Sequence, residues 1–392
     1  MAQRTLADAR GLVLGWGPKK GEDAPFLQRL WPVVLAAAGA GNGLTVNAKM
    51  LETLLAGCAR DCLNSRKRRD ELVAAFTPML EASCDPAGAA AVLIDATLEY
   101  HSHHLDTNGG VCKLGKFHNI LYVTASVAVE QEVRDSQAVT RLLRALHLCE
   151  GGLDRLVTPA VLGPKVSHLL SSWRCDTDTP EEARHRLQFF MNHARSTRLL
   201  LPRARGPPVP LVDAPLPSLQ GASPLYMAVQ ATDEDAVLLL LQNGATPFLG
   251  GQFCPFLLVL RRLSSHARAV IGQMPPCSCP EQLFREQLSP KQLYLEQLCS
   301  CRLQHPIQYP PEALAVLRLL LRAVGARRVD RDPEIIHLRL LQDGLLGGPP
   351  PLKHWARYSV RTALRRAWTL PQATSSLGLP LSLVAYLDLC LD

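Results

Sequence analysis

The feature that most constrains this chain of 392 residues is a dense cluster of prolines in its middle. Residues 202–217, "PRARGPPVPLVDAPLP", hold six prolines in sixteen positions. Proline fixes φ and lacks a backbone N–H, so this segment cannot be helical and favours an extended, semi-rigid connection. The sequence therefore predicts a linker at 202–219 that follows an N-terminal region, 1–201. The P-x-x-P pattern from Pro207 to Pro210 is too common to outweigh the linker interpretation.

The N-terminal region has the periodicity of helices. Apolar residues recur at three- and four-residue spacing in 45–63, 69–83 and 87–101. A further helix is expected to start at Thr179, because Thr179 can cap backbone N–H groups, Pro180 needs no donor and Glu182 completes a capping box. The segment 119–129, "NILYVTASVAV", leaves a strand and a buried helix open. The predicted fold class is all-α.

A pair of short helices follows the prolines. Ser223-Pro224 can begin the first helix, a polar turn at 233–235 precedes the second, and Gly244 can end it. Two antiparallel helices and a glycine stop within about thirty residues describe one solenoid repeat.

This segment resembles an ankyrin repeat, with "SPLYMAV" in the place of T-P-L-H-x-A. The match begins again at Pro255, 31 positions after Pro224 and near the ankyrin period of about 33. The resemblance implies ankyrin repeats over 220–330, with the last helix at 313–326 and an insertion at 262–310. Isolated repeats cannot bury both faces, so the N-terminal region is expected to supply the missing cap, as degenerate ankyrin-like units or as an unrelated helical domain.

Three prolines and an amphipathic helix lie near the C-terminus. Proline stops the preceding solenoid and can start the helix of "PPPLKHWARYSV", residues 349–360. Leu352, Ala356 and Val360 recur at i, i+4 and i+8 and should form one narrow apolar ridge. The basic residues of the helix are expected to remain solvated; they are Lys353, Arg357, Arg361, Arg365 and Arg366.

Residues 348–392 resemble a SOCS box, the small three-helix C-terminal module of the ankyrin repeat and SOCS box-containing protein family. Its elongin-binding helix begins with a small residue or proline and continues L-x-x-x-C-x-x-x-(A, L or V), which places elongin C on Pro351, Leu352, Ala356 and Val360. Ala356 replaces the usual cysteine. The cullin-selecting motif, L-P-L-P-x-x-L-x-x-Y-L, falls on Leu377, Leu379, Pro380, Leu383, Tyr386 and Leu387, with Gly378 in the place of the first proline.

The resemblance implies a non-catalytic subunit of a ubiquitin ligase. In that family the box binds elongin C, which is bound to elongin B, and recruits cullin-5 with its RING subunit, while the ankyrin region holds the protein substrate. The alternative is an ankyrin scaffold that recruits no ligase, whose last helices cap the solenoid and pack permanently inside its own fold.

Other functional classes have weaker support. The net charge of +7 is spread out and aromatic residues make up only 5% of the chain, which disfavours nucleic acid as a partner. The basic run 66–69 is best explained as a solvated helix face. No apolar run could span a membrane and no signal segment begins the chain, so a cytoplasmic protein is expected, with the nucleus as a second compartment.

No cofactor or metal is expected from the sequence. Gly39, Gly41 and Gly43 do not form a dinucleotide-binding motif, and an exposed polar turn explains a histidine-rich group better than a metal site; its members are His101, His103, His104 and Asp106. The twelve cysteines are scattered, as in a protein with free thiols. Two C-x-C pairs are more awkward for zinc than the usual spacing of two to four residues; they are Cys277, Cys279, Cys299 and Cys301.

Overall fold

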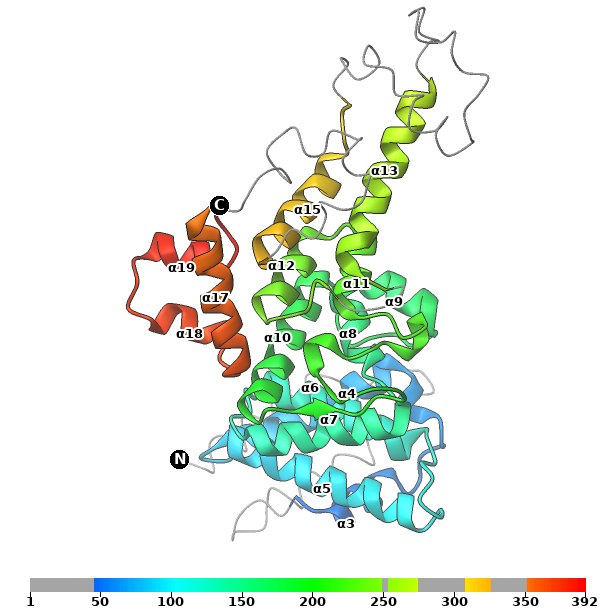
Figure 1. Ribbon diagram of the computed structural model, residues 1–392. Coiled ribbons are helices and arrows are strands. Elements are labelled where there is room, and N and C mark those ends of the chain that lie inside the picture. Colours follow the sequence, from blue (N-terminus) through cyan, green and yellow to red (C-terminus); the bar gives the residue numbers. More distant parts are fainter. Residues whose placement is uncertain (1–45, 249–252, 274–306, 326–350) are drawn as a thin grey trace, which may run out of the picture. The chain divides into compact units, whose positions relative to one another are not determined.

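The computed structural model describes residues 46–248, 253–273, 307–325 and 351–392, and these form two compact helical units that meet in the sequence at Gly221 (Figure 1). The predicted all-α class is confirmed, because the described residues contain one two-stranded ribbon and are otherwise helical or irregular. The glycine run at 39–43 and the two C-x-C pairs lie outside the described residues.

The first unit contains eight α-helices in its described part. They are α3 (Ala48–Leu55), α4 (Arg66–Glu81), α5 (Pro86–Asp106), α6 (Lys116–Glu130), α7 (Ser136–Glu150), α8 (Asp154–Leu162), α9 (Pro164–Ser171) and α10 (Pro180–Ser196), with a 3₁₀ turn, η1 (Cys62–Asn64). The predicted capping box at the start of α10 is confirmed, because the Thr179 side chain accepts from the Glu182 backbone N–H and Glu182 reaches back.

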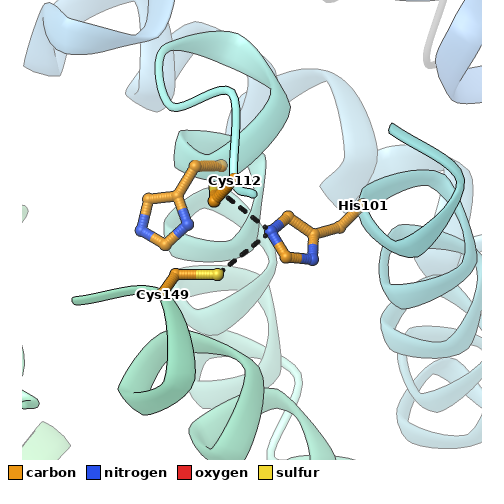
Figure 2. A group of neighbouring side chains, drawn as sticks. His101, Cys112 and Cys149 are labelled. Atoms are coloured by element: carbon orange, nitrogen blue, oxygen red, sulfur yellow. Dashed lines mark hydrogen bonds between the residues drawn. The ribbon is translucent and has the colours of Figure 1, made fainter. Parts of the chain in front are cut away.

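Helix α6 is the centre of this unit. It packs against α4, α5 and α7, and it is buried along nearly all of its length. Segment 119–129 therefore forms a buried helix, and the strand alternative is wrong. β-Branched residues are compatible with a helix surrounded by other helices, where burial outweighs their strand preference. On the neighbouring helices, His101 of α5 and Cys149 of α7 come within 3.4 Å between Nε2 and Sγ (Figure 2).

The proline-rich segment is folded and belongs to the first unit. Strand β1 (Leu200–Leu201) pairs antiparallel with β2 (Val209–Pro210), and two 3₁₀ turns follow, η2 (Leu211–Asp213) and η3 (Pro217–Leu219). The segment buries four apolar side chains, those of Leu211, Val212, Ala214 and Leu216. The prediction of an extended linker at 202–219 is thus corrected: prolines exclude a helix, but they are compatible with a short hairpin whose apolar residues find a core.

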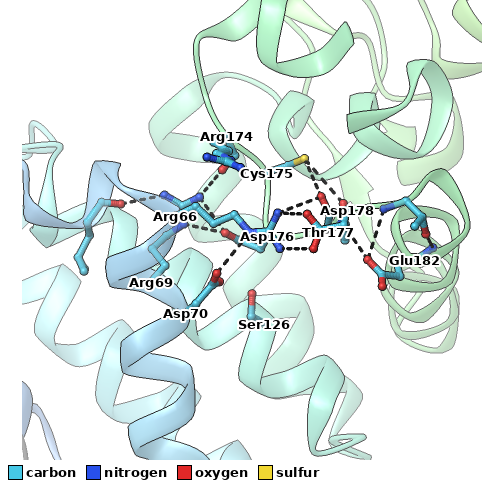
Figure 3. A network of polar contacts seen from close by, with 12 residues as sticks. Arg66, Arg69, Asp70, Ser126, Arg174, Cys175, Asp176, Thr177, Asp178 and Glu182 are labelled. Carbon is cyan, nitrogen blue, oxygen red and sulfur yellow. Dashed lines mark hydrogen bonds and ion pairs between the residues drawn. The ribbon is translucent and has the colours of Figure 1, made fainter. Parts of the chain in front are cut away.

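A buried arginine holds the beginning of α4 to the segment before α10 (Figure 3). Arg69 is 1% exposed and its guanidinium donates to the carbonyls of Leu63 and Asn64, each at 3.0 Å, to the carbonyl of Arg174, and to the carboxylate of Asp176 at 2.8 Å. The same guanidinium lies 3.8 Å from the centre of the Trp173 ring. The basic run at 66–69 is therefore only partly a solvated face, since Arg69 is a core residue.

The second unit begins with the expected helix pair, α11 (Pro224–Ala231) and α12 (Glu234–Gln242). Ser223 and Asp233 cap these helices through their side chains, and Gly244 follows α12 with φ of +86°, which a residue with a Cβ rarely adopts. Helices α13 (Pro255–Gln273) and α15 (Pro311–Ala323) pack on the pair and on each other. The predicted insertion at 262–310 begins inside a helix, because α13 continues to Gln273.

The chain ends in three helices that belong to the second unit. They are α17 (Leu352–Arg366), α18 (Gln372–Ser376) and α19 (Leu381–Leu387), and α19 contacts both α17 and α18. Among the helices of the described ranges, none combines the length and the apolar content needed to span a bilayer.

We expect Arg69→Met to destabilise the first unit by about 3 kcal/mol, because three carbonyls lose a donor and the Asp176 carboxylate, 11% exposed, loses its ion pair. Urea unfolding followed by circular dichroism measures the change. Arg141→Met is the matched control: its ion pair with Asp95 is about half exposed on both sides and should contribute less than about 1 kcal/mol. Equal effects of the two variants would contradict the structural role of Arg69.

Candidate functional site

The buried face of helix α17 is polar, whereas Lys353, Arg365 and Arg366 of the same helix are exposed, as expected. His354, Arg357 and Arg361 are 7%, 3% and 7% exposed and form the buried face of the helix. The expectation that Arg357 and Arg361 are solvated is wrong. Each finds backbone carbonyls that need a donor, and these come from segments far from α17 in the sequence.

Arg361 joins the C-terminal ends of two helices. Its Nη1 donates to the carbonyl of Leu387 at 2.7 Å, and its Nη2 donates to the carbonyl of Leu241 at 2.5 Å. Leu387 ends α19, and Leu241 lies in the last turn of α12, where carbonyls lack an i+4 helical partner and the helix dipole favours a cation. The Leu241 carbonyl also accepts from the Gly244 N–H at 2.9 Å. Burial lowers the pKa of Arg361 to about 10, so the group is still a cation at neutral pH.

His354 and Arg357, on the same buried face of α17, hydrogen-bond to two further carbonyls. His354 Nε2 lies 2.7 Å from the carbonyl of Val324, just after α15, and must carry the proton because a carbonyl only accepts. Arg357 donates to the carbonyl of Leu391 at 3.0 Å, and its guanidinium lies 4.2 Å from the centre of the Tyr386 ring. A hydrogen bond at 3.2 Å joins Arg357 Nη2 to His354 Nδ1. Polar contacts thus attach α17 to its own unit.

Gly325 allows α17 to approach the end of α15. A Cβ at Gly325 would lie 2.5 Å from the Tyr358 ring, so any larger residue would require the ring or the helix to shift.

The opposite side of α17 is open. Leu352 is 85% exposed, Ala356 is exposed and Val360 is half-buried, and Pro351 precedes the helix as an exposed N-cap. The predicted ridge therefore exists at the surface. Trp355, which the sequence did not single out, is 40% exposed and lies about 60° around the helix from Leu352, so it widens the ridge. Tyr358 is 36% exposed but lies on another side of the helix, against Gly325. Their burial depends on neighbours of α17 that helical spacing does not reveal.

The residues of the predicted cullin-binding motif, around α19, are partly exposed and partly buried. Leu377, Leu379, Pro380 and Leu383 are exposed. Tyr386 is half-buried under the Arg357 guanidinium, and Leu387 is 6% exposed. These two residues of the predicted cullin-binding set therefore face their own unit, and Leu387 is a core residue. Leu381, at an unspecified position of the motif, is 86% exposed and extends the apolar surface.

Gly378 departs from the motif in its backbone as well as its side chain. Its φ is +67°, a conformation that proline cannot adopt because its ring fixes φ near −65°. A proline here would require another path between α18 and α19.

The members of the histidine-rich group at the end of α5 lie in different environments. His104 Nε2 lies 2.8 Å from the Glu52 carboxylate, His103 and Asp106 are exposed, and His101 is buried on another side of the helix. Burial and the nearby His118 and His104 lower the pKa of His101 to about 4, so its imidazole is neutral at physiological pH. The four residues do not share one site.

Comparisons of the chain with protein-family models, with curated proteins and with solved structures found no match.

We expect Arg361→Met to loosen α17. The carbonyl of Leu387 would lose its donor at a cost of about 1 to 3 kcal/mol, whereas the carbonyl of Leu241 would keep its hydrogen bond from the Gly244 N–H at 2.9 Å. Hydrogen exchange of α17 and α19 should become faster, and the melting temperature should fall. Arg366→Met, which changes an exposed arginine of the same helix, is the control and should leave both unchanged. Unchanged exchange in Arg361→Met would show that the guanidinium does not hold the helix.

Proposed function

We propose that this chain is a substrate-binding subunit of an elongin–cullin–RING ubiquitin ligase. The observation that carries the proposal is the arrangement of α17, whose buried face is polar, with His354, Arg357 and Arg361, and whose apolar ridge is largely exposed. An exposed leucine next to an exposed tryptophan is costly in water, and such apolar patches are typical of protein-binding surfaces.

In this proposal, α17 docks on elongin C through Leu352, Ala356 and Val360, with Pro351 at the edge of the contact. The exposed side chain of Trp355 lies beside Leu352 and can contribute to the same interface. Ala356 keeps this part of the ridge low, so the partner can approach the α17 backbone closely.

The segment from Leu377 to Leu383 is the proposed contact for cullin-5. Leu377, Leu379, Pro380 and Leu383 supply the exposed residues, whereas Tyr386 and Leu387 position the segment from below. This divides the cullin motif into contact residues and residues that support them.

The helix pair α11 and α12 is proposed to be an ankyrin repeat, with α13 and α15 as a second, interrupted repeat. Its capped helices and the left-handed Gly244 fit the resemblance of "SPLYMAV" and "LLLLQNGATP". The repeats and the helical first unit would hold the target protein. Ubiquitination would then depend on effective concentration: the target's lysines are brought near a conjugating enzyme on other subunits, and this chain supplies no catalytic residue.

The alternative, an ankyrin scaffold without a ligase, requires the last helices to pack inside their own fold. For the Leu352 ridge this disagrees with a side chain that is 85% exposed. The ligase proposal is therefore favoured.

We expect elongins B and C to co-purify with the wild-type chain and to be lost from Leu352→Asp. A charge in place of a buried anchor at an interface should weaken binding by about 2 kcal/mol or more, which is about 30-fold. Leu169→Asp is the matched control, since Leu169 in the first unit is 82% exposed and its substitution should leave elongin binding unchanged. Both variants should keep the wild-type circular dichroism spectrum.

Two outcomes of the elongin assay would contradict the proposal. Failure of the wild-type chain to retain the elongins, or equal retention by wild type and Leu352→Asp, would rule out docking through this ridge and favour the scaffold.

We expect Leu383→Asp to keep the elongins but to weaken binding of the purified elongin complex to the N-terminal domain of cullin-5. Biolayer interferometry with the immobilised cullin domain measures this. Leu391→Asp is the control, because Leu383 and Leu391 are both 47% exposed and only Leu383 lies on the motif. Equal cullin affinity of the two variants would exclude Leu383 from the contact.

A further inference from the structure

Four potential metal ligands gather in the first unit, whereas the surface discussed above belongs to the second. His101 belongs to α5, Cys112 to the loop between α5 and α6, His118 to α6 and Cys149 to the last turn of α7. One ligand atom from each lies within 4.8 Å of all the others. Figure 2 shows His101, Cys112 and Cys149 pointing toward one another.

The distances fit a tetrahedral ion. His101 Nε2 lies 3.6 Å from Cys112 Sγ and 3.4 Å from Cys149 Sγ. With Zn–S bonds of about 2.3 Å and Zn–N bonds of about 2.0 to 2.1 Å at tetrahedral angles, nitrogen and sulfur ligands are about 3.6 Å apart. The ligands need only small shifts to close around zinc.

His118 supplies an independent observation. It is 1% exposed, and its Nδ1 is buried without a hydrogen-bond partner among the described residues. Leaving a buried nitrogen without a partner is costly, so a partner is expected. The other nitrogen, Nε2, is occupied by Glu150 Oε1 at 2.8 Å. Nδ1 is thus the nitrogen that His118 can offer to the cluster.

Glu150 has the position of a carboxylate that supports a metal-bound histidine. It accepts from His118, from the Tyr122 hydroxyl at 2.7 Å, and it pairs with Arg155 at 3.1 Å. A carboxylate behind a histidine fixes the ring and the tautomer that leaves the opposite nitrogen free to bind metal.

We propose that His101, Cys112, His118 and Cys149 form a structural zinc site. Two thiolates and two imidazoles are ligands that zinc prefers, and four protein ligands leave no open position for a substrate. The ion would tie the loop after α5 to the end of α7, which are brought together only by folding. The proposal is independent of the ligase function.

The test uses the full chain with Cys277, Cys279, Cys299 and Cys301 replaced by serine, so that these thiols cannot bind a second ion. After gel filtration in chelator-free buffer, mass spectrometry of the metal content should find about one zinc ion per chain. Adding Cys112→Ser should remove that ion, whereas adding Cys84→Ser, which changes an exposed cysteine outside the cluster, should not. Cys112 lies in a loop, so its substitution perturbs no helix.

Alkylation of the wild-type chain supplies a second measurement that needs no variant. Iodoacetamide should modify Cys84 at once, and Cys112 and Cys149 only after a chelator has removed the ion. Replacement of zinc by Co²⁺ should give the visible absorption bands of a tetrahedral thiolate site.

Three results would overturn the proposal. They are a metal-free chain purified from zinc-containing medium, equal zinc content with and without Cys112→Ser, and a disulfide between Cys112 and Cys149 in the native chain.

Discussion

The C-terminal unit depends on one guanidinium that joins two helix ends. In the last turns of α12 and α19, the carbonyls of Leu241 and Leu387 lack the usual i+4 helical partner, and Arg361 donates to both of them. Since the donor must reach these carbonyls in the interior, the polar face of α17 has to point inward. Its apolar ridge is consequently left at the surface. The exposure of Leu352 is thus a physical consequence of how the carbonyls of other helices are satisfied.

The first unit uses the same chemistry in a different place. Arg69 satisfies carbonyls at the start of α4 and before α10, and Trp173 covers its guanidinium. The planar group offers five donors, which suits it to sites where several carbonyls converge. In both units a buried arginine donates to carbonyls near helix ends: those before α4 and α10 in the first unit, and those in the last turns of α12 and α19 in the second. The rigid scaffolds that result can present a docking ridge in one unit and, in our proposal, hold a metal ion in the other.

Local rules predicted well wherever the decisive contact lies within one helical turn. The capping box at Thr179, the Ser223 cap and the glycine after α12 agree with the structure, because each involves residues three or four positions apart. Predictions failed where distant partners decide. The proline-rich segment packs its apolar residues in the core as a hairpin, and Arg357 and Arg361 donate to buried carbonyls. For the segment 119–129, which the sequence left open between strand and buried helix, the surrounding helices decided. The cluster around His118 had no spacing signal, because its ligands come from three helices and a loop.

The amino-acid order was sufficient to place α4, α5, α10, α11, α12 and α17, several of their caps and the i, i+4, i+8 ridge of Leu352, Ala356 and Val360, since these follow from backbone geometry over a few residues. It was not sufficient to say which face of α17 is buried or which histidine meets which cysteine. Those outcomes depend on where carbonyls, carboxylates and thiols from remote segments come together. A buried arginine is tolerated only when such partners are present, and folding alone brings them within hydrogen-bonding distance.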